Sequence, residues 1–148
     1  PMRPISLLAL AALCGLALSA PAGAQTAATA DAATLGSSKR TAVEVCMPPG
    51  ERNYIRRLRC SDGAVPDFRR VGSVGMRDEV PPRNEGETDD AHLARLHALM
   101  DSGEQDFHII DLYALRCSDA MHELYMDMYH CGSEPPAQAP VGFTYAPE

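Results

Sequence analysis

The chain has 148 residues, of which 13 are Lys or Arg and 20 are Asp or Glu, so its net charge is −7 at neutral pH. This acidic balance argues against nucleic acid as a partner, because proteins that bind nucleic acid concentrate positive charge. Once the amino-terminal targeting pattern is set aside, the length suffices for one small domain.

Residues 2–24 have the pattern of a secretory signal peptide. Arg3 supplies the positive charge, residues 5–20 form an apolar stretch that is short for crossing a bilayer, and residues 22–24 (AGA) form a small-residue cleavage site. The Ala-rich style resembles a bacterial export signal. We therefore expect residues 1–24 to be removed, leaving no stable membrane span and a periplasmic or extracellular protein. An uncleaved signal anchor is the alternative.

The segments that flank the expected domain have compositions typical of disorder. Residues 25–39 are mainly Ala, Thr, Ser and Gly, which cannot bury enough apolar surface to offset the entropy of ordering, so we expect a tether. Residues 134–148 form a Pro-rich tail, although Phe143 and Tyr145 can dock on the domain. The domain itself is expected over residues 40–133.

Three segments in the first half of this domain have the alternation or the β-branched content typical of strands. They are residues 41–47 (TAVEVCM), residues 53–60 (NYIRRLRC) and residues 65–76, of which the last is interpreted as a loop or an edge strand because of its two glycines. Pro-Pro-Gly after the first segment and Asp-Gly after the second are turn signals.

Residues 89–102 are predicted to form the one helix. Thr88 or Asp89 can cap its amino-terminal end, where acidic residues also suit the helix dipole. An apolar stripe along the helix predicts the face that packs on the sheet. The stripe consists of Leu93, Leu96 and Met100.

Residues 107–131 (FHIIDLYALRCSDAMHELYMDMYHC) form the densest apolar and aromatic run after the signal segment, and they predict a β-hairpin that turns at residues 118–121. In this register Cys117 faces His122, and Arg116 faces Glu123 as a favourable charge pair. The alternative is a strand followed by a helix over residues 120–129, whose apolar residues also recur at helical spacing.

Four cysteines remain after signal cleavage, namely Cys46, Cys60, Cys117 and Cys131. An even number in an oxidising compartment predicts two disulfides, each adding about 2–4 kcal/mol, and the alternative of a zinc site lacks any C-x-x-C spacing. Because Cys117 and Cys131 lie at opposite ends of the predicted hairpin, we expect bridges between the two halves of the chain; the alternative is a bond between Cys117 and Cys131 in a hairpin of different register. The fold is therefore predicted to be α+β, with a small, mostly antiparallel sheet, one packed helix and two disulfides after a cleaved signal peptide.

Two regularities accompany the cysteines. The sequence LRCSD occurs at residues 58–62 and 115–119, either as a degenerate repeat or as convergent turn chemistry. Charge is also uneven, because residues 39–83 carry a net charge of +4 and residues 84–148 carry −11. A cluster of arginines in the basic half is the candidate binding site for an anionic partner, unless it is a solvated face paired with the acidic half. It consists of Arg56, Arg57 and Arg59.

The residues best suited to chemistry lie within the hairpin. His130 and Asp111 share its more apolar face, where an Asp can orient a His acting as general base, so they are the candidate catalytic residues. His108 and Asp127 share the other face and are candidate ligands for a divalent metal, which is the one cofactor that the sequence suggests. The alternative is a buried Asp–His pair with a purely structural role.

Established catalytic signatures are missing from the sequence, which contains no P-loop, no G-x-S-x-G, no H-E-x-x-H and no EF-hand loop. We therefore expect a small, secreted or periplasmic binding protein whose partner is an unknown protein or an anionic envelope ligand. A small His/Asp-based hydrolase or metal-binding enzyme is the alternative. A structural component of the cell envelope is the third possibility.

Overall fold

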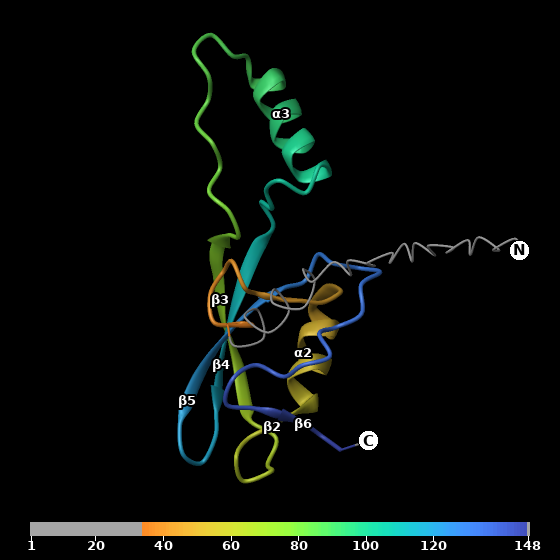
Figure 1. Ribbon diagram of the computed structural model, residues 1–148. Coiled ribbons are helices and arrows are strands. Elements are labelled where there is room, and N and C mark those ends of the chain that lie inside the picture. Colours follow the sequence, from red (N-terminus) through yellow and green to blue (C-terminus); the bar gives the residue numbers. More distant parts are fainter. Residues whose placement is uncertain (1–33, 148) are drawn as a thin grey trace, which may run out of the picture.

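The computed structural model describes residues 34–147, so the predicted signal peptide and most of the predicted tether lie outside the described residues. Within the described part, two helices, a mixed sheet of four strands and a small two-stranded sheet form an α+β fold (Figure 1). This confirms the predicted class. No helix in residues 34–147 has the length and apolar character needed to cross a membrane.

The main sheet has the strand order β1-β5-β4-β3. β4 (Ile109–Arg116) pairs antiparallel with both β5 (Met121–Asp127) and β3 (Asp67–Met76), while the short β1 (Val43–Glu44) pairs parallel with β5. The prediction of a hairpin rather than a strand and helix is therefore confirmed. β3 is an edge strand, as residues 65–76 indicated, and two register shifts interrupt its pairing with β4.

The predicted register of the hairpin is wrong by two residues. Leu115 rather than Cys117 lies opposite His122. The cause is a tighter turn, because the Cys117 N–H donates to the carbonyl three residues further on, at 2.9 Å, and only two residues form the loop. A shift of two keeps every side chain on its predicted face, but it removes the predicted pairing of Arg116 with Glu123.

The predicted strand over residues 53–60 is also wrong, since most of it belongs to helix α2 (Met47–Arg57). Pro48 and Pro49 stand in the first turn of α2, where a missing N–H costs no helical hydrogen bond. Tyr54 and Ile55 are buried from this helix and pack in the core with side chains of the main sheet. α2 is thus the helix that covers the sheet (Figure 1).

Helix α3 (Asp89–Asp101) confirms the predicted helix but not its predicted packing. The Thr88 hydroxyl accepts a hydrogen bond from the Ala91 N–H at 3.3 Å, as expected of a cap. No residue of α3 is buried, and Leu93 of the predicted stripe is 52% exposed. The connection between β3 and β4 carries α3 beyond the end of the sheet as an arm, defined here as residues 77–108 (Figure 1).

The carboxyl-terminal segment returns to the body of the protein. Strand β6 (Thr144–Tyr145) pairs antiparallel with β2 (Leu58–Arg59), and Phe143 packs against the core as anticipated. The Tyr145 ring makes an edge contact with Tyr54 at a centroid separation of 6.0 Å, and the Arg57 guanidinium lies 4.6 Å from the centre of the Tyr145 ring. These contacts cover one side of α2.

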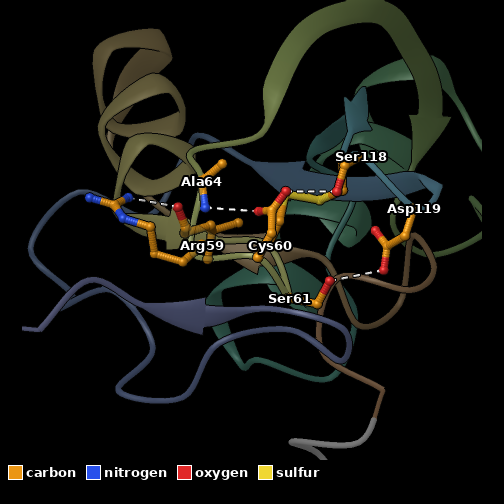
Figure 2. The surroundings of a disulfide bond; sticks show 9 residues. Arg59, Cys60, Ser61, Ala64, Ser118 and Asp119 are labelled. Carbon is orange, nitrogen blue, oxygen red and sulfur yellow. Dashed lines mark hydrogen bonds between the residues drawn. A yellow bond between two sulfur atoms is a disulfide. The ribbon is translucent and has the colours of Figure 1, made fainter.

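Two disulfides join the first half of the chain to the second, as predicted. Cys46 bonds to Cys131, and Cys60 bonds to Cys117. The second bond joins the two copies of LRCSD, and it is flanked by two equivalent hydrogen bonds. The Ser61 hydroxyl donates to Asp119 at 2.9 Å (Figure 2), and Ser118 of the other copy donates to Asp62 at 2.6 Å.

This reciprocal arrangement gives the repeated sequence a structural role. In each copy the Cys forms the covalent bond, while the Ser and the Asp bind the Asp and the Ser of the other copy. The hydrogen bond from Ser118 lowers the pKa of Asp62. The repeat therefore marks a self-complementary turn contact at the end of the sheet away from the arm.

Candidate metal centre

Four side chains that can ligate a metal converge where the arm meets the sheet. They are Asp106, His108, Asp127 and His130, and one nitrogen or oxygen atom from each lies within 4.8 Å of those from the other three. Asp106 and His108 precede β4, Asp127 is the last residue of β5, and His130 follows three residues later. Because β4 and β5 are antiparallel, the start of one lies beside the end of the other.

The chain beyond β5 is held in place by the segment that follows β1. The Val45 N–H donates to the Asp127 carbonyl at 2.8 Å, and the His130 N–H donates to the Val45 carbonyl at 3.1 Å. Tyr129 forms a bridge with Cys46 between these hydrogen bonds. These interactions hold the His130 side chain beside that of Asp127, three residues earlier in the chain.

Four nitrogen–oxygen separations in the cluster are close to those between the ligands of one small ion, and the two that involve Asp106 use different oxygens of its carboxylate. His108 Nδ1 lies 2.9 Å from Asp106 Oδ1 and 3.7 Å from Asp127 Oδ2. His130 Nε2 lies 3.1 Å from Asp127 Oδ2 and 3.5 Å from Asp106 Oδ2. A tetrahedral zinc ion with bonds of about 2.0–2.2 Å holds its ligand atoms about 3.3–3.5 Å apart, and the four observed values bracket this range.

The environment of His108 also favours a cation between these groups. Its Nδ1 atom is buried and makes no hydrogen bond, although Asp106 Oδ1, which accepts a hydrogen bond from the His108 backbone N–H, lies only 2.9 Å away. A neutral imidazole nitrogen and a carboxylate oxygen repel each other at this distance unless a proton or a metal lies between them. Stacking on the Tyr129 ring, with centroids 4.9 Å apart, fixes the plane of His108.

Arg77 and Glu44 complete the cluster. Arg77 is 12% exposed and contacts three carboxylates at 2.9–3.1 Å, those of Glu44, Asp106 and Asp127. Three carboxylates and one guanidinium leave a net charge of −2 when both imidazoles are neutral. A divalent cation cancels this charge. Asp127 is fully buried, and a buried charge without compensation is energetically costly.

Glu44 also lies behind the second nitrogen of a candidate ligand. Its Oε2 atom is 3.5 Å from His130 Nδ1, on the other side of the ring from Nε2. A carboxylate in this position orients a metal-bound imidazole and raises its basicity. The cluster therefore has four candidate ligands and two supporting residues, Arg77 and Glu44.

The structure brings together three of the four predicted site residues, namely His108, Asp127 and His130. The faces predicted for the hairpin had kept them apart, but His108 and His130 lie outside β4 and β5, where strict alternation does not apply. Asp106 was not predicted. The spacing Asp-x-His at residues 106–108, beside Asp-x-x-His at residues 127–130, is the signal that could have identified it.

Asp111, the fourth predicted residue, lies in a different set of contacts. It faces Met126 across the sheet, and its buried carboxylate accepts two hydrogen bonds from Arg70, at 2.5 and 2.7 Å, and one from Ser73 at 3.0 Å. The Asp111 carboxylate raises the pKa of Arg70. A charge held by three donors is suited to stabilising the fold, and Asp111 does not share the cluster with His130.

Arg57 and Arg59 of the predicted anion-binding site already contact other groups of the protein. Arg59 donates to the carbonyls of Arg56 and Leu58 at 2.9 and 2.7 Å, and Arg57 lies against Tyr145. Arg56 and Arg57 are exposed at the end of α2, so binding of an anionic partner there stays a prediction.

A second group, Cys117, Asp119 and His122, also has metal-ligand spacing, but Cys117 is bonded to Cys60 and offers no thiolate. The cluster at the base of the arm is thus the better metal site among the described residues. Comparisons of the chain with protein-family models, curated proteins and solved structures found no match.

Proposed function

We propose that the protein binds one divalent transition-metal ion through Asp106, His108, Asp127 and His130, and that it does so in an oxidising compartment outside the cytoplasm. The observation that carries this proposal is the convergence of four metal-ligating side chains, with one ligand atom from each within 4.8 Å of the others and nitrogen–oxygen separations of 2.9, 3.1, 3.5 and 3.7 Å. The buried Nδ1 atom of His108, which makes no hydrogen bond, and the net charge of −2 that the cluster carries with neutral imidazoles also support it.

The donor atoms favour zinc among the available metals. Imidazole nitrogen with carboxylate oxygen suits Zn²⁺ and its neighbours, whereas Cu⁺ prefers the thiolates and thioethers that this set lacks. Mg²⁺ and Ca²⁺ prefer oxygen ligands alone and more of them. The separations suit a small tetrahedral coordination sphere, so Zn²⁺ is the first metal to test.

Binding is favoured over catalysis because four protein ligands leave a tetrahedral ion no open position for a substrate. A metal-dependent hydrolase remains the second candidate on one observation. A cavity of about 360 Å³ is lined by Glu44 and Arg77, the two supporting residues, although none of the four candidate ligands lines it, so a small ligand bound there would contact the supporting residues. Hydrolysis requires that one carboxylate gives up its place to water when the substrate binds.

Zinc titration of the purified, oxidised protein tests the proposal. After removal of metal with a chelator, we expect one Zn²⁺ per chain, measured by competition with a chromophoric chelator and by elemental analysis. His130→Ala is expected to weaken binding at least about 100-fold, while His97→Ala, on the exposed surface of α3, should leave it unchanged. Equal zinc binding by the two variants, or none by the wild type, overturns the proposal.

A further inference from the structure

We infer that the Cys46–Cys131 disulfide controls the affinity of this metal centre, so that the protein holds its metal tightly only when this bond is oxidised. The inference rests on the proposed function and adds a redox dependence to it. The other disulfide, Cys60–Cys117, does not have this role.

Each cysteine of this bond lies close in sequence to a residue of the cluster. Cys131 directly follows the candidate ligand His130, and Cys46 lies two residues after Glu44, which faces the same imidazole at 3.5 Å. The disulfide therefore joins the residue next to one candidate ligand to a residue close to Glu44, the carboxylate that faces the same imidazole. The Cα atoms of the two cysteines are 4.4 Å apart, which leaves their neighbours little freedom to separate.

His130 depends on this bond because it stands beyond the end of the sheet. β5 ends at Asp127, and the backbone that follows is held at the isolated bridge between Tyr129 and Cys46. There the Met47 N–H donates to the Met128 carbonyl at 2.7 Å and the His130 N–H donates to the Val45 carbonyl at 3.1 Å, while the Tyr129 N–H donates to the Asp127 side chain at 3.0 Å. An isolated bridge at a strand end opens easily. The disulfide prevents this local opening, because it bonds Cys131, the residue after His130, to Cys46, the residue after Val45.

The remaining ligands have support of their own. Asp127 belongs to β5, and the backbone at Asp106 and His108 is joined to the other side of the arm by hydrogen bonds of 2.9 Å from the N–H groups of Asp78 and Arg77. Opening of the Cys46–Cys131 bond therefore loosens one ligand of the four. Loss of a group that orients a metal ligand costs about 10–100-fold in affinity, and we expect a decrease of this size.

Cys60–Cys117 supplies a matched control within the same chain. Cys117 lies just beyond the far end of β4, roughly 26 Å from its start for eight steps of about 3.3 Å. This bond also joins the two halves of the domain, so its removal should lower stability without touching the metal centre. If removal of the two disulfides changes zinc affinity by different amounts, the difference reflects how close each bond lies to the metal cluster and not the loss of stability alone.

The test compares three oxidised proteins, namely the wild type, Cys46→Ser with Cys131→Ser, and Cys60→Ser with Cys117→Ser. Circular dichroism first establishes that each is folded at the temperature used, and Zn²⁺ affinity is then measured by chelator competition. We expect a 10–100-fold weaker affinity for the first pair of substitutions and less than a 3-fold change for the second. Equal affinities in all three proteins, or a larger loss from the second pair, overturn the inference.

A chemical version of the experiment covers the case in which a variant does not fold. The wild type is reduced stepwise with a water-soluble phosphine, which becomes the phosphine oxide with oxygen from water while each disulfide becomes two thiols. The thiols are alkylated, so that they cannot bind zinc, and mass spectrometry identifies the opened bond. Loss of affinity that follows opening of Cys46–Cys131 supports the inference, and loss that follows only Cys60–Cys117, or no loss, overturns it.

The two proposals fail in different ways. A wild-type oxidised protein without stoichiometric zinc contradicts the metal centre itself. A wild type that binds zinc with the same affinity before and after opening of Cys46–Cys131 contradicts only the redox dependence.

Discussion

Glu51 is a carboxyl group that α2 buries completely, and its replacement by Gln tests how the protein accommodates it. Its Oε2 atom accepts a hydrogen bond from the Tyr113 hydroxyl at 2.9 Å, while Oε1 is buried without a hydrogen-bond partner. Burial raises the pKa of Glu51 above its ordinary value of 4.5, and this outweighs the opposite effect of the Tyr113 hydrogen bond. The negative charge of Asp111 adds to the increase.

This raised pKa sets the sign of the pH dependence. The folded state holds the proton of Glu51 more tightly than the unfolded state, so the resulting stability is fully present below pH 4.5 and is lost as the pH rises through the folded pKa. Within that window, the free energy of unfolding falls by up to about 1.4 kcal/mol per pH unit relative to a variant without this carboxyl group. Gln resembles the protonated carboxyl and can still accept from Tyr113.

We therefore expect Glu51→Gln to match the wild type near about pH 4 and to become progressively more stable than it as the pH rises. Urea unfolding at several pH values, in the presence of a chelator, measures the difference. Glu104→Gln, which removes an exposed carboxylate, is the control and should run parallel to the wild type. If the Glu51→Gln curve is also parallel to that of the wild type, Glu51 does not hold its proton in the folded state and the reasoning is refuted.

Three further substitutions probe other parts of the structure. Asp127→Asn keeps the shape of a fully buried candidate ligand but removes its charge, while Arg77 keeps two other carboxylates, so we expect loss of zinc binding, with Asp101→Asn on α3 as the unaffected control. Arg70→Met leaves the buried Asp111 carboxylate with Ser73 as its remaining side-chain donor and should cost about 1–3 kcal/mol, whereas no loss would mean that water replaces the arginine. Leu93→Gln should change the unfolding free energy by less than about 0.5 kcal/mol, because α3 buries nothing; a loss near 2 kcal/mol would show that the helix packs against the body in solution.

Local chemistry in the sequence was enough to predict the hairpin, the α3 boundaries and the pairing of the two halves by disulfides. Ser118-Asp119 gave the position of the turn, and Thr88 gave the start of the helix. The register could not be obtained in the same way, because a loop of two residues and one of four use the same turn residues. Only the hydrogen bond made by Cys117 distinguishes them.

Helix α2 was missed because its first residues, Pro48 and Pro49, were interpreted as a turn after a strand. Pro48-Pro49 suggested the end of a strand, but the same residues suit the first turn of a helix. The buried residues Glu51, Tyr54 and Ile55 lie at a spacing of three and four, which is helical, and a charged residue at the first of these positions concealed the pattern.

The candidate metal cluster was only partly predictable from the sequence, for a related reason. Residue type identified His108, Asp127 and His130, but the convergence of residues just beyond strand ends depends on how the connecting backbone turns. Asp106 lies before the apolar run that drew attention to the others. Arg77 lies 29 residues before it in the chain and meets it only because both sides of the arm return to one point.

The two disulfides are nested, and this constrains the order in which the molecule can assemble. The inner bond spans a separation of 57 residues and lies wholly within the 85 residues spanned by the outer one. The β4–β5 hairpin joins residues close in sequence and can form early. The parallel pairing of β1 with β5 joins residues far apart in the chain, so we expect it to form later. The candidate metal cluster includes both kinds of contact, because Glu44 lies on β1 while its four candidate ligands lie in or beside the β4–β5 hairpin. We therefore expect Glu44 to join the cluster only after the parallel pairing of β1 with β5 has formed.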